Sequence, residues 1–254
     1  MSIPYKILVC IKQVPDVNAK IYLEKTKPYY DEKTVYVINR YDEYALEEAL
    51  QIKDKGLTHY IHTISSGPER VQKALRRSLE MGADEAYHIV TGDDDCAIPY
   101  YVARCITEFA KKEYDIIFTG VMSQDAMNQQ TGQLIASIMG YNYATGVTSI
   151  QTNDDEITVT RELDAQTSMQ YVLKIPCVVT VQSSSTMPRY PSLSNVLRAK
   201  KQHIDIIKPI MSSQVQYHSF YTIPQKTTEC EFIQGSTDQK VVELYNILHR
   251  NGVV

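Results

Sequence analysis

Two hydrophobic patterns alternate along the first half of the chain. Short apolar runs of the buried-strand type occur at residues 5–11, 34–38, 59–64, 86–90 and 115–120. Between these runs, apolar side chains recur at intervals of three and four residues, which is the spacing of one helix face. The predicted helices cover residues 41–53, a segment that starts near Pro68, 97–111 and about 128–139. Strands that alternate with helices form a parallel sheet with helices on both faces, so the pattern predicts an α/β fold.

The pattern changes after Gly146, where strand-like segments follow one another without helices between them. They cover residues 147–150, 156–163, 168–174 and 177–181. Consecutive strands joined by short turns pair in antiparallel fashion, which predicts an antiparallel extension at one edge of the sheet. The α/β domain with this extension is expected to span residues 1–204.

Beyond Ile204 the periodicity weakens, and residues 211–235 are polar and irregular. A final helix is predicted from Thr237, with Gly252 as a C-terminal stop. Its apolar side chains share one face and are Val241, Leu244, Tyr245 and Leu248. A long irregular segment is unusual inside a compact domain. We therefore interpret residues 205–254 as an extended arm that ends in a helix and clasps a partner chain.

Composition and charge exclude several classes of function. The 26 lysines and arginines against 30 acidic residues give a net charge of −4 without a long basic block, which argues against nucleic-acid binding. The five cysteines are odd in number and form no CxxC pair, which is typical of reduced thiols rather than a disulfide framework or a zinc site. The six histidines lie far apart in sequence, so no metal site is expected.

The amino terminus lacks a charged secretory n-region, and no apolar run approaches the ~20 residues that cross a bilayer. We expect a soluble protein without direct membrane insertion, located in the cytoplasm or, as a mature form, in the mitochondrial matrix. No nucleophile motif and no convincing acid–base pair is present, so no catalytic residue is predicted. The chain is expected to hold a ligand and to dock on partners rather than to transform a substrate.

A proline-containing segment at residues 187–201 follows the apolar run 177–181 and a polar link. Pro188 and Pro191 favour a stiff, extended loop, and a short basic helix is predicted to begin at Ser192 or Ser194. A rigid loop with an apolar tip beside a basic helix is typical of a docking surface. The candidate docking residues are Leu193, Arg189, Tyr190, Arg198 and Lys201. In the alternative interpretation this is an ordinary loop, and Leu193 packs into the chain's own core.

Polar residues directly follow four of the predicted strands, at 10–12, 39–42, 65–67 and 120–131. Ligands of open α/β sheets bind at this carboxyl edge. The last segment runs into a helix and offers amides, a hydroxyl and glycines as donors to an anion, and the helix dipole adds to them. It matches neither the GxGxxG fingerprint nor a P-loop, and no lysine accompanies it. A phosphate held mainly by neutral donors indicates a tightly kept nucleotide rather than a hydrolysed triphosphate.

Helix capping is the alternative role of several of these residues. Asp125 and Asn128 are suitable caps for the helix that follows them, and Asn39 is a suitable cap for the helix predicted at 41–53. Asp42 then falls at the third position of that helix, where a negative charge is favourable. Spacing alone leaves both interpretations open.

Three motifs carry a resemblance to a known family. The first is Pro188-Arg189-Tyr190-x-x-Leu193-x-Asn195 followed by Ala199-Lys200-Lys201, the second is the segment 39–49, and the third is Gln130-Thr131-Gly132-Gln133. Over roughly residues 6–208 the chain resembles the β subunits of electron-transfer flavoproteins. In that family the first motif is a recognition loop that docks partner dehydrogenases with the leucine as its anchor, and the third is a phosphate loop. The second is similar to the family's Asn-Pro-x-x-x-x-x-Ala-x-Glu-x-Ala, with Arg40 in place of the proline.

The resemblance implies a Rossmann-like domain with a recognition loop at residues 182–201 and an adenine-nucleotide pocket. Carried over by position, the pocket is lined by Cys10, Asn39, Arg40, Tyr41, Asp42, Ser66, Gly120, Ser123, Gln124, Asp125, Asn128, Gln129, Gln130 and Thr131. Most members hold a structural AMP there, whereas electron-bifurcating members hold a second FAD. Gln130-Thr131-Gly132-Gln133 is the AMP form. The segment 161–169 lacks the usual Asp-Gly-Gly-x-Glu, however, and residues 168–169 and 174–181 look more like the bifurcating branch. We favour AMP.

For the whole assembly, the resemblance implies a heterodimer with an electron-transfer flavoprotein α subunit, which supplies most of the FAD site. The turn at residues 10–16 would approach that flavin. Glu162 would pair with an arginine on the mobile flavin domain, and its alternative is a solvated carboxylate at a strand edge.

Electrons would pass from an acyl-CoA or similar flavin dehydrogenase, through that flavin, to a quinone-linked oxidoreductase or other acceptor. Two alternatives stay open. One is an electron-bifurcating β subunit in which a second FAD receives hydride from NADH. The other is a stand-alone nucleotide-binding regulatory protein of the same superfamily.

Overall fold

A computed structural model describes residues 4–24, 27–153, 156–164, 167–184, 186–209, 230 and 232–253. Most of the stretch predicted to be irregular, 211–235, lies outside the described residues, as do positions 165–166 of the segment 161–169. The chain divides into two units, Met1–Tyr22 with Tyr29–His218, and Leu23–Pro28 with Ser219–Val254. The first unit contains the large sheet and the candidate site.

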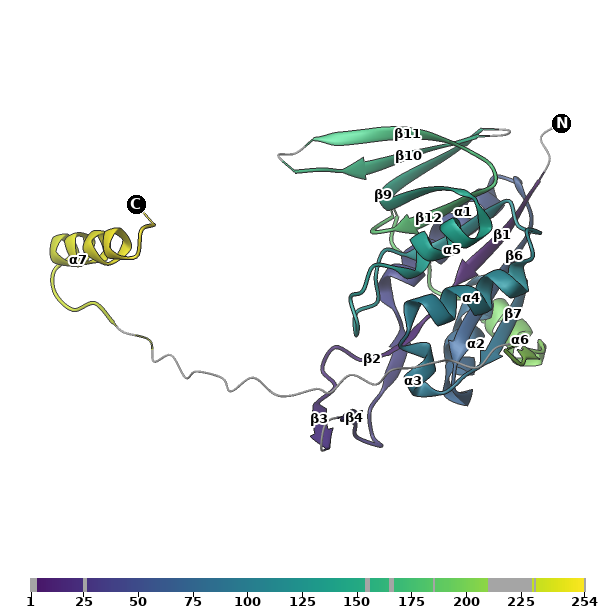
Figure 1. Ribbon diagram of the computed structural model, residues 1–254, viewed down its shortest axis with the longest axis horizontal. Coiled ribbons are helices and arrows are strands. Elements are labelled where there is room, and N and C mark those ends of the chain that lie inside the picture. Colours follow the sequence, from purple (N-terminus) through teal and green to yellow (C-terminus); the bar gives the residue numbers. More distant parts are fainter. Residues whose placement is uncertain are drawn as a thin grey trace. The chain divides into compact units, whose positions relative to one another are not determined.

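A nine-stranded sheet forms the centre of the first unit, in the order β11-β10-β9-β12-β8-β1-β6-β7-β13 (Figure 1). Neighbouring strands from β9 through β13 in this order pair in parallel, whereas β10 pairs antiparallel with both β9 and β11. The predicted α/β fold, with a mostly parallel sheet and an antiparallel edge, is therefore confirmed.

The strands of this sheet are β1 (Tyr5–Cys10), β6 (Thr58–Gly67), β7 (Glu85–Val90), β8 (Ile116–Gly120), β9 (Asn142–Asn153), β10 (Glu156–Glu162), β11 (Ser168–Lys174), β12 (Cys177–Val181) and β13 (Asp205–Ile207). Two small two-stranded sheets pair β2 (Gln13–Pro15) with β5 (Tyr36–Ile38), and β3 (Ile21–Glu24) with β4 (Lys27–Tyr30).

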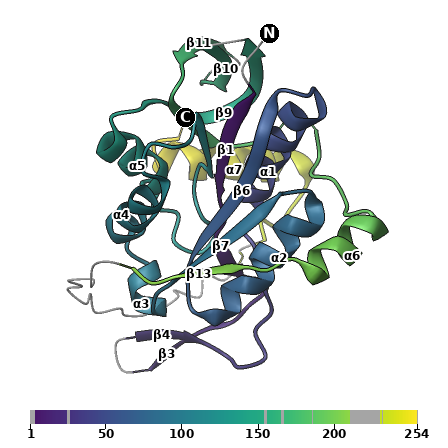
Figure 2. The same cartoon turned by 90° about the vertical axis from the view of Figure 1, so that its right-hand side faces the viewer.

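Helices cover both faces of the large sheet (Figure 2). One face packs against α1 (Arg40–Asp54) and α2 (Gln72–Met81), with α6 (Leu193–Lys201) packed beside α2, and the other against α4 (Pro99–Ala110) and α5 (Thr131–Met139). Side chains of β1 alternate between the two cores, because Ile7 and Val9 belong to the first and Leu8 and Cys10 to the second. A strand buried on both faces is apolar throughout, which explains the continuous hydrophobic runs in the sequence.

Strand β12 differs from the prediction, which placed residues 177–181 in the antiparallel extension. It lies inside the sheet and runs parallel to β8 and to β9, with Val179 beside Phe118 and Ala144. All its residues are buried, as is typical of a parallel strand. The prediction was wrong because the two residues between β11 and β12 look like a hairpin link, although β9 and β10 separate these strands in the sheet.

Four further elements also differ from the prediction. Helix α5 begins at Thr131 rather than near residue 128, because Met127 and Gln129 have left-handed backbone angles (φ 51° and 54°) that a helix cannot contain. A single turn, α3 (Asp93–Cys96), lies between the predicted strand 86–90 and the predicted helix 97–111, and a 3₁₀ turn at Glu69–Val71 precedes α2. Strand β13 pairs with β7 and was missed because three residues carry no periodic signal.

In the second unit, the helix predicted from Thr237 is α7 (Thr237–Arg250). Ser236 caps it, and Gln239 bonds back to the Ser236 amide, which completes a capping box. Its apolar side chains Val241, Leu244 and Tyr245 are exposed, and the clasping of a partner stays a prediction. None of the helices in the described part of the chain is long and apolar enough to cross a membrane.

Replacing Gly132 by alanine tests the packing of α5 on the sheet. An added Cβ would collide with Thr180 Cγ2 and would lie 2.8 Å from Thr119 Oγ1. We expect Gly132→Ala to lower the free energy of unfolding in urea by about 1–3 kcal/mol. Ser137→Ala, on the exposed side of the same helix, is the matched control and should change it by less than about 0.5 kcal/mol. Similar losses in both variants would contradict this packing.

Candidate functional site

A pocket opens at the carboxyl edge of the sheet, where β1, β6 and β8 end beside the first turn of α5. Chain segments that are far apart in the sequence meet there, as predicted for ligands of parallel sheets. The lining residues are Cys10, Ile11, Lys12, Asn39, Asp42, Ile64, Ser66, Cys96, Ala97, Pro99, Val102, Ile106, Thr119, Gly120, Val121, Met122, Ser123, Ala126, Asn128, Gln129, Gln130 and Thr131.

Asp42 joins the first turn of α1 to the ends of two strands. Its carboxylate accepts the backbone N–H of Lys12 after β1 (2.7 Å) and of Gly120 at the end of β8 (2.9 Å). The approach is so close that a Cβ on residue 120 would collide with Asp42 Oδ1 and lie 2.7 Å from Tyr41 Cβ. Only glycine fits at this position, which is why the strand β8 ends on one.

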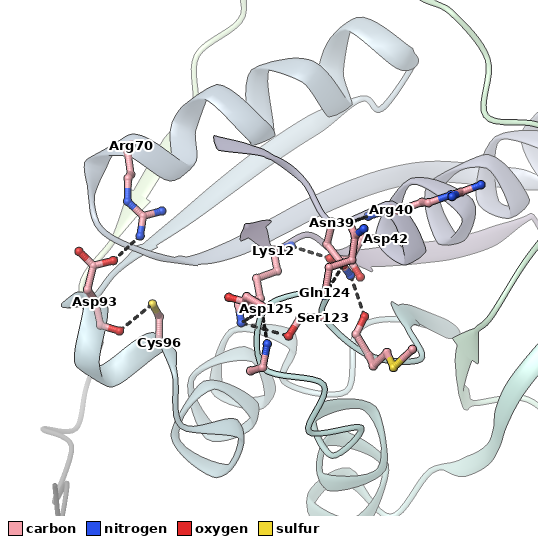
Figure 3. Close-up of polar contacts among 12 residues, drawn as sticks. Lys12, Asn39, Arg40, Asp42, Arg70, Asp93, Cys96, Ser123, Gln124 and Asp125 are labelled. Carbon is pink, nitrogen blue, oxygen red and sulfur yellow. Dashed lines mark hydrogen bonds and ion pairs between the residues drawn. The ribbon is translucent and has the colours of Figure 1, made fainter. Parts of the chain in front are cut away.

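Asn39 fixes the loop that follows β8. Its side-chain amide donates to the Met122 carbonyl (2.8 Å) and accepts the N–H of Gln124 (3.1 Å) (Figure 3). Asn39 is the N-cap residue of α1, as predicted, but its side chain makes no bond to the amides of that helix. The polar side chain instead holds the pocket loop against the helix.

Burial is the main influence on the pKa of Asp42. The carboxyl is 6 % exposed, and burial raises its pKa to about 7. The Lys12 amide, the Asn39 side chain, the Gly120 amide and the Lys12 charge act in the opposite direction, because each favours the ionised form. The proton is therefore lost from the folded protein at a higher pH than from the unfolded chain.

Lys12 brings a positive charge into the pocket. Its ammonium group lies 2.7 Å from Asp125 Oδ1 and donates to Ser123 Oγ at 3.2 Å (Figure 3). Burial alone would raise the pKa of Asp125, but Lys12, Ser123 and the Ala126 amide hold it below its usual value. The segment 120–131 itself contains no lysine, as noted from the sequence, but the fold brings one to it from the turn after β1.

The first turn of α5 supplies further donors. Its N-cap is Gln130, which makes no side-chain bond to the helix amides. The predicted caps Asp125 and Asn128 lie in the loop before the helix, so their capping role was wrong. Backbone N–H groups in an uncapped first turn bind anions well. Together with Lys12 and the Ser123 and Thr131 hydroxyls, they give the pocket a donor-rich end.

The structure brings most of the predicted cofactor residues to the pocket wall. These are Cys10, Asn39, Asp42, Ser66, Gly120, Ser123, Asn128, Gln129, Gln130 and Thr131. The other four, Arg40, Tyr41, Gln124 and Asp125, are not part of the lining. The Arg40 guanidinium points away and bonds the Tyr44 hydroxyl at 3.1 Å, while the Gln124 side chain accepts the Arg40 amide N–H at 3.1 Å. Whether the lining residues bind a cofactor stays a prediction.

An apolar wall was missed by the sequence analysis. It comes from α3 and α4 and consists of Cys96, Ala97, Pro99, Val102 and Ile106. The available signal was Pro99, which suits the first turn of a helix. Burial raises the pKa of the Cys10 thiol and, with Asp93 adding to it, raises that of Cys96 to about 11. Both thiols are therefore protonated and unreactive at neutral pH.

The recognition loop (182–201) presents its apolar tip to solvent. Tyr190 is 91 % exposed and Leu193 is 76 % exposed, which contradicts the alternative that Leu193 packs into the chain's own core. Helix α6 begins at Leu193, and the Ser192 hydroxyl accepts the Asn195 N–H at 3.2 Å, so of the two predicted starts Ser192 is the cap. Lys201 is exposed in the last turn of α6.

Two of the predicted docking residues turn inward instead. The Arg189 guanidinium binds Glu47 and Asp54 on α1, and the Arg198 guanidinium donates to the Leu79 carbonyl at 3.2 Å. Glu162 lies exposed at the end of β10 opposite Ser168, and its pairing with a flavin domain stays a prediction. In the described ranges no three His, Cys, Asp or Glu side chains gather to hold a metal ion.

The protonation of Asp42 predicts a pH-dependent stability. Between pH ~4 and ~7 the folded protein keeps a proton that the unfolded chain releases, so its free energy of unfolding falls as pH rises. Asp42→Asn removes this titration but places an NH₂ group against a backbone donor. We expect the stability advantage of the natural protein over Asp42→Asn, measured in urea, to shrink by up to about 1.4 kcal/mol per pH unit in that window. A difference that is independent of pH would show that Asp42 titrates normally.

Comparison with known proteins places the chain in a family. A family model described as electron transfer flavoprotein domain matches residues 29–210. The electron transfer flavoprotein subunit beta of Dictyostelium discoideum is 32 % identical over 206 residues, 80 % of this chain and 81 % of the relative. Those of Homo sapiens and Syntrophomonas wolfei are 31 % identical over 231 residues (87 % and 90 %) and 34 % over 200 residues (78 % and 78 %). The chain therefore belongs to the electron transfer flavoprotein family, among its β subunits.

Proposed function

We propose that this chain forms a heterodimer with an electron transfer flavoprotein α subunit and carries electrons between a flavin dehydrogenase and an acceptor. The dehydrogenase is of the acyl-CoA type, and the acceptor is a quinone-linked oxidoreductase or another electron acceptor. The observation that carries the proposal is the exposed tip at Tyr190 and Leu193. The neighbouring Arg189 binds α1, the helix whose Asp42 lies in the pocket wall. The chain acts in the cytoplasm or in the mitochondrial matrix, and the relative from Arabidopsis thaliana is described as mitochondrial.

The FAD that carries the electrons is held mainly by the α subunit in this proposal. This chain contributes the turn around residues 10–16, which ends in the small β2–β5 sheet. Glu162 contacts the flavin domain from the antiparallel edge. The contribution of the β subunit is then positional, because it fixes the flavin-bearing partner beside the docking loop.

In this proposal, the pocket at the carboxyl edge holds an AMP molecule. Its donor-rich end, with Lys12, Ser123, Thr131 and the first amides of α5, suits a phosphate group. The apolar side, with Cys10, Ile64 and Ile106, suits the face of an adenine ring. Lys12 is already neutralised by Asp125, so the net charge offered to a phosphate is small. A firmly kept structural nucleotide is more consistent with this arrangement than one that is hydrolysed.

Counting cofactors decides between AMP and a second FAD. The heterodimer is purified and denatured, and the released nucleotides are quantified by chromatography. We expect one FAD and one AMP per heterodimer. Two FAD and no AMP would support the electron-bifurcating alternative, in which NADH reduces a flavin in this pocket. A monomer that carries no flavin-bearing partner would instead support a nucleotide-binding regulatory protein.

Truncating the exposed leucine tests the docking role. Leu193→Ala should raise the KM for the heterodimer in flavin reduction by an acyl-CoA dehydrogenase by about tenfold or more, because an exposed apolar anchor contributes ~2 kcal/mol when buried in a partner. The FAD content should stay unchanged. Ile138→Ala truncates another exposed aliphatic side chain, on α5 and outside the loop, and should leave the KM unaltered. Unchanged kinetics in Leu193→Ala would refute the anchor assignment.

A further inference from the structure

One polar face of α1 holds the start of the recognition loop. Glu47, Glu48, Gln51 and Asp54 follow the spacing of a single helix face, and all four bind residues between 184 and 189. We call these four side chains the α1 seat. The α1 seat lies on the helix whose first turn, with Asn39 and Asp42, closes the nucleotide pocket.

Arg189 makes the strongest set of contacts with the α1 seat. Its Nη2 lies 2.8 Å from Glu47 Oε1, its Nε 2.9 Å from Glu47 Oε2, and its backbone N–H donates to the same Oε2 at 3.1 Å. The Nη2 group also donates to Asp54 Oδ2 at 2.8 Å. A bidentate arginine–carboxylate pair fixes the orientation of the guanidinium as well as its distance from the carboxylate.

Burial makes this pair sensitive to the loss of either partner. Glu47 is 4 % exposed, and a carboxylate at that depth needs a cation and hydrogen-bond donors. Removing the partner of a buried charge is far more costly than removing an exposed ion pair. Asp54 is exposed, so its contribution is expected to be smaller.

The hydroxyl groups of the link complete the seat. Ser184 Oγ donates to Glu48 Oε1 at 2.7 Å, and Gln51 Nε2 donates to Ser184 Oγ at 3.3 Å and to Thr186 Oγ1. The loop is therefore attached to α1 on both sides of residue 185 and again at Arg189.

A reciprocal pair of arginines holds the other end of the loop. Arg76 of α2 donates to the carbonyls of Ala199 and, at 2.5 Å, of Gln202, which end α6. Arg198 of α6 donates to the carbonyls of Leu79 (3.2 Å) and Ala83 (3.5 Å) at the end of α2. Each cation thus lies at the negative end of the other helix.

The tip between these two attachments is exposed to solvent. Its most exposed apolar side chains are Tyr190 and Leu193, whereas the charge of Arg189 faces inward. We propose that Arg189 is a positioning residue, which the buried Glu47 of the α1 seat holds so that the tip is presented to a partner in one preorganised conformation. This inference rests on the proposed docking function. A preorganised loop loses less conformational entropy when it binds, so its affinity is higher.

The test compares five variants of the heterodimer: Glu47→Gln, Arg189→Gln, the double variant, Asp54→Asn, and Lys55→Gln as a control. Lys55→Gln removes one exposed positive charge from the end of α1, outside the recognition loop. Each is assayed for FAD content, for kcat and KM with a purified acyl-CoA dehydrogenase, and for thermolysin cleavage between Ser192 and Leu193 in the absence of the dehydrogenase.

We expect Glu47→Gln and Arg189→Gln each to raise the KM about tenfold, which corresponds to about 1.4 kcal/mol, with kcat and FAD content unchanged. The double variant should be no worse than either single one, since both remove the same contact. Thermolysin should cut all three several-fold faster than the natural protein. Lys55→Gln should match the natural protein, and Asp54→Asn should give a smaller effect than Glu47→Gln.

Two results would overturn the inference. A raised KM in Arg189→Gln with normal kinetics in Glu47→Gln would mean that Arg189 contacts the partner directly, because the buried Glu47 cannot. Normal kinetics and normal cleavage in both would mean that the seat does not order the loop. If the natural heterodimer is not reduced by the dehydrogenase, the proposed function fails, and the cleavage rates alone then decide whether the α1 seat orders the loop.

Discussion

The hydrogen bonds of the Asp42 carboxylate join the parts on which the site depends. One buried side chain in the first turn of α1 accepts the amide of Lys12 beyond β1 and that of Gly120 at the end of β8. A carboxylate is tolerated at such depth only where donors satisfy it, and here the sheet itself sets the positions of the donors. Gly120 cannot be larger, because the carboxylate occupies the space of a Cβ. The Asp42 carboxylate therefore fixes the first turn of α1 relative to the ends of β1 and β8.

Helix α1 also connects the pocket to the recognition loop. Its first turn closes the pocket, and its middle and last turns bind the recognition loop through Glu47, Gln51 and Asp54. In the proposed function, the pocket keeps a nucleotide in place, and the loop offers an exposed apolar tip that a partner can cover. Both features depend on polar contacts that face inward and leave Leu193 outward. In the proposed function, the nucleotide pocket and the docking loop are thus two surfaces of one rigid support.

The sequence predicted the parallel core because strands buried on both faces are apolar throughout, as in Ile7 to Cys10. It also located the pocket, because polar residues follow such strands directly. The sequence did not indicate which segments, distant along the chain, lie side by side in the fold. Nothing local indicates that β12 inserts between β8 and β9, or that Lys12 reaches Asp125 across 113 positions. The sequence also could not predict that the Arg189 guanidinium faces α1, because the same local sequence is compatible with an exposed arginine.

Hydrogen–deuterium exchange of the heterodimer, with and without an acyl-CoA dehydrogenase, tests most directly whether the tip held by α1 is the docking surface. The account predicts slower exchange on complex formation for peptides that cover residues 187–197. Peptides from the pocket segment 120–131 should exchange equally in both samples, since their contacts lie within the chain and its ligand. Unchanged exchange at 187–197, with protection appearing elsewhere on this chain, would contradict it.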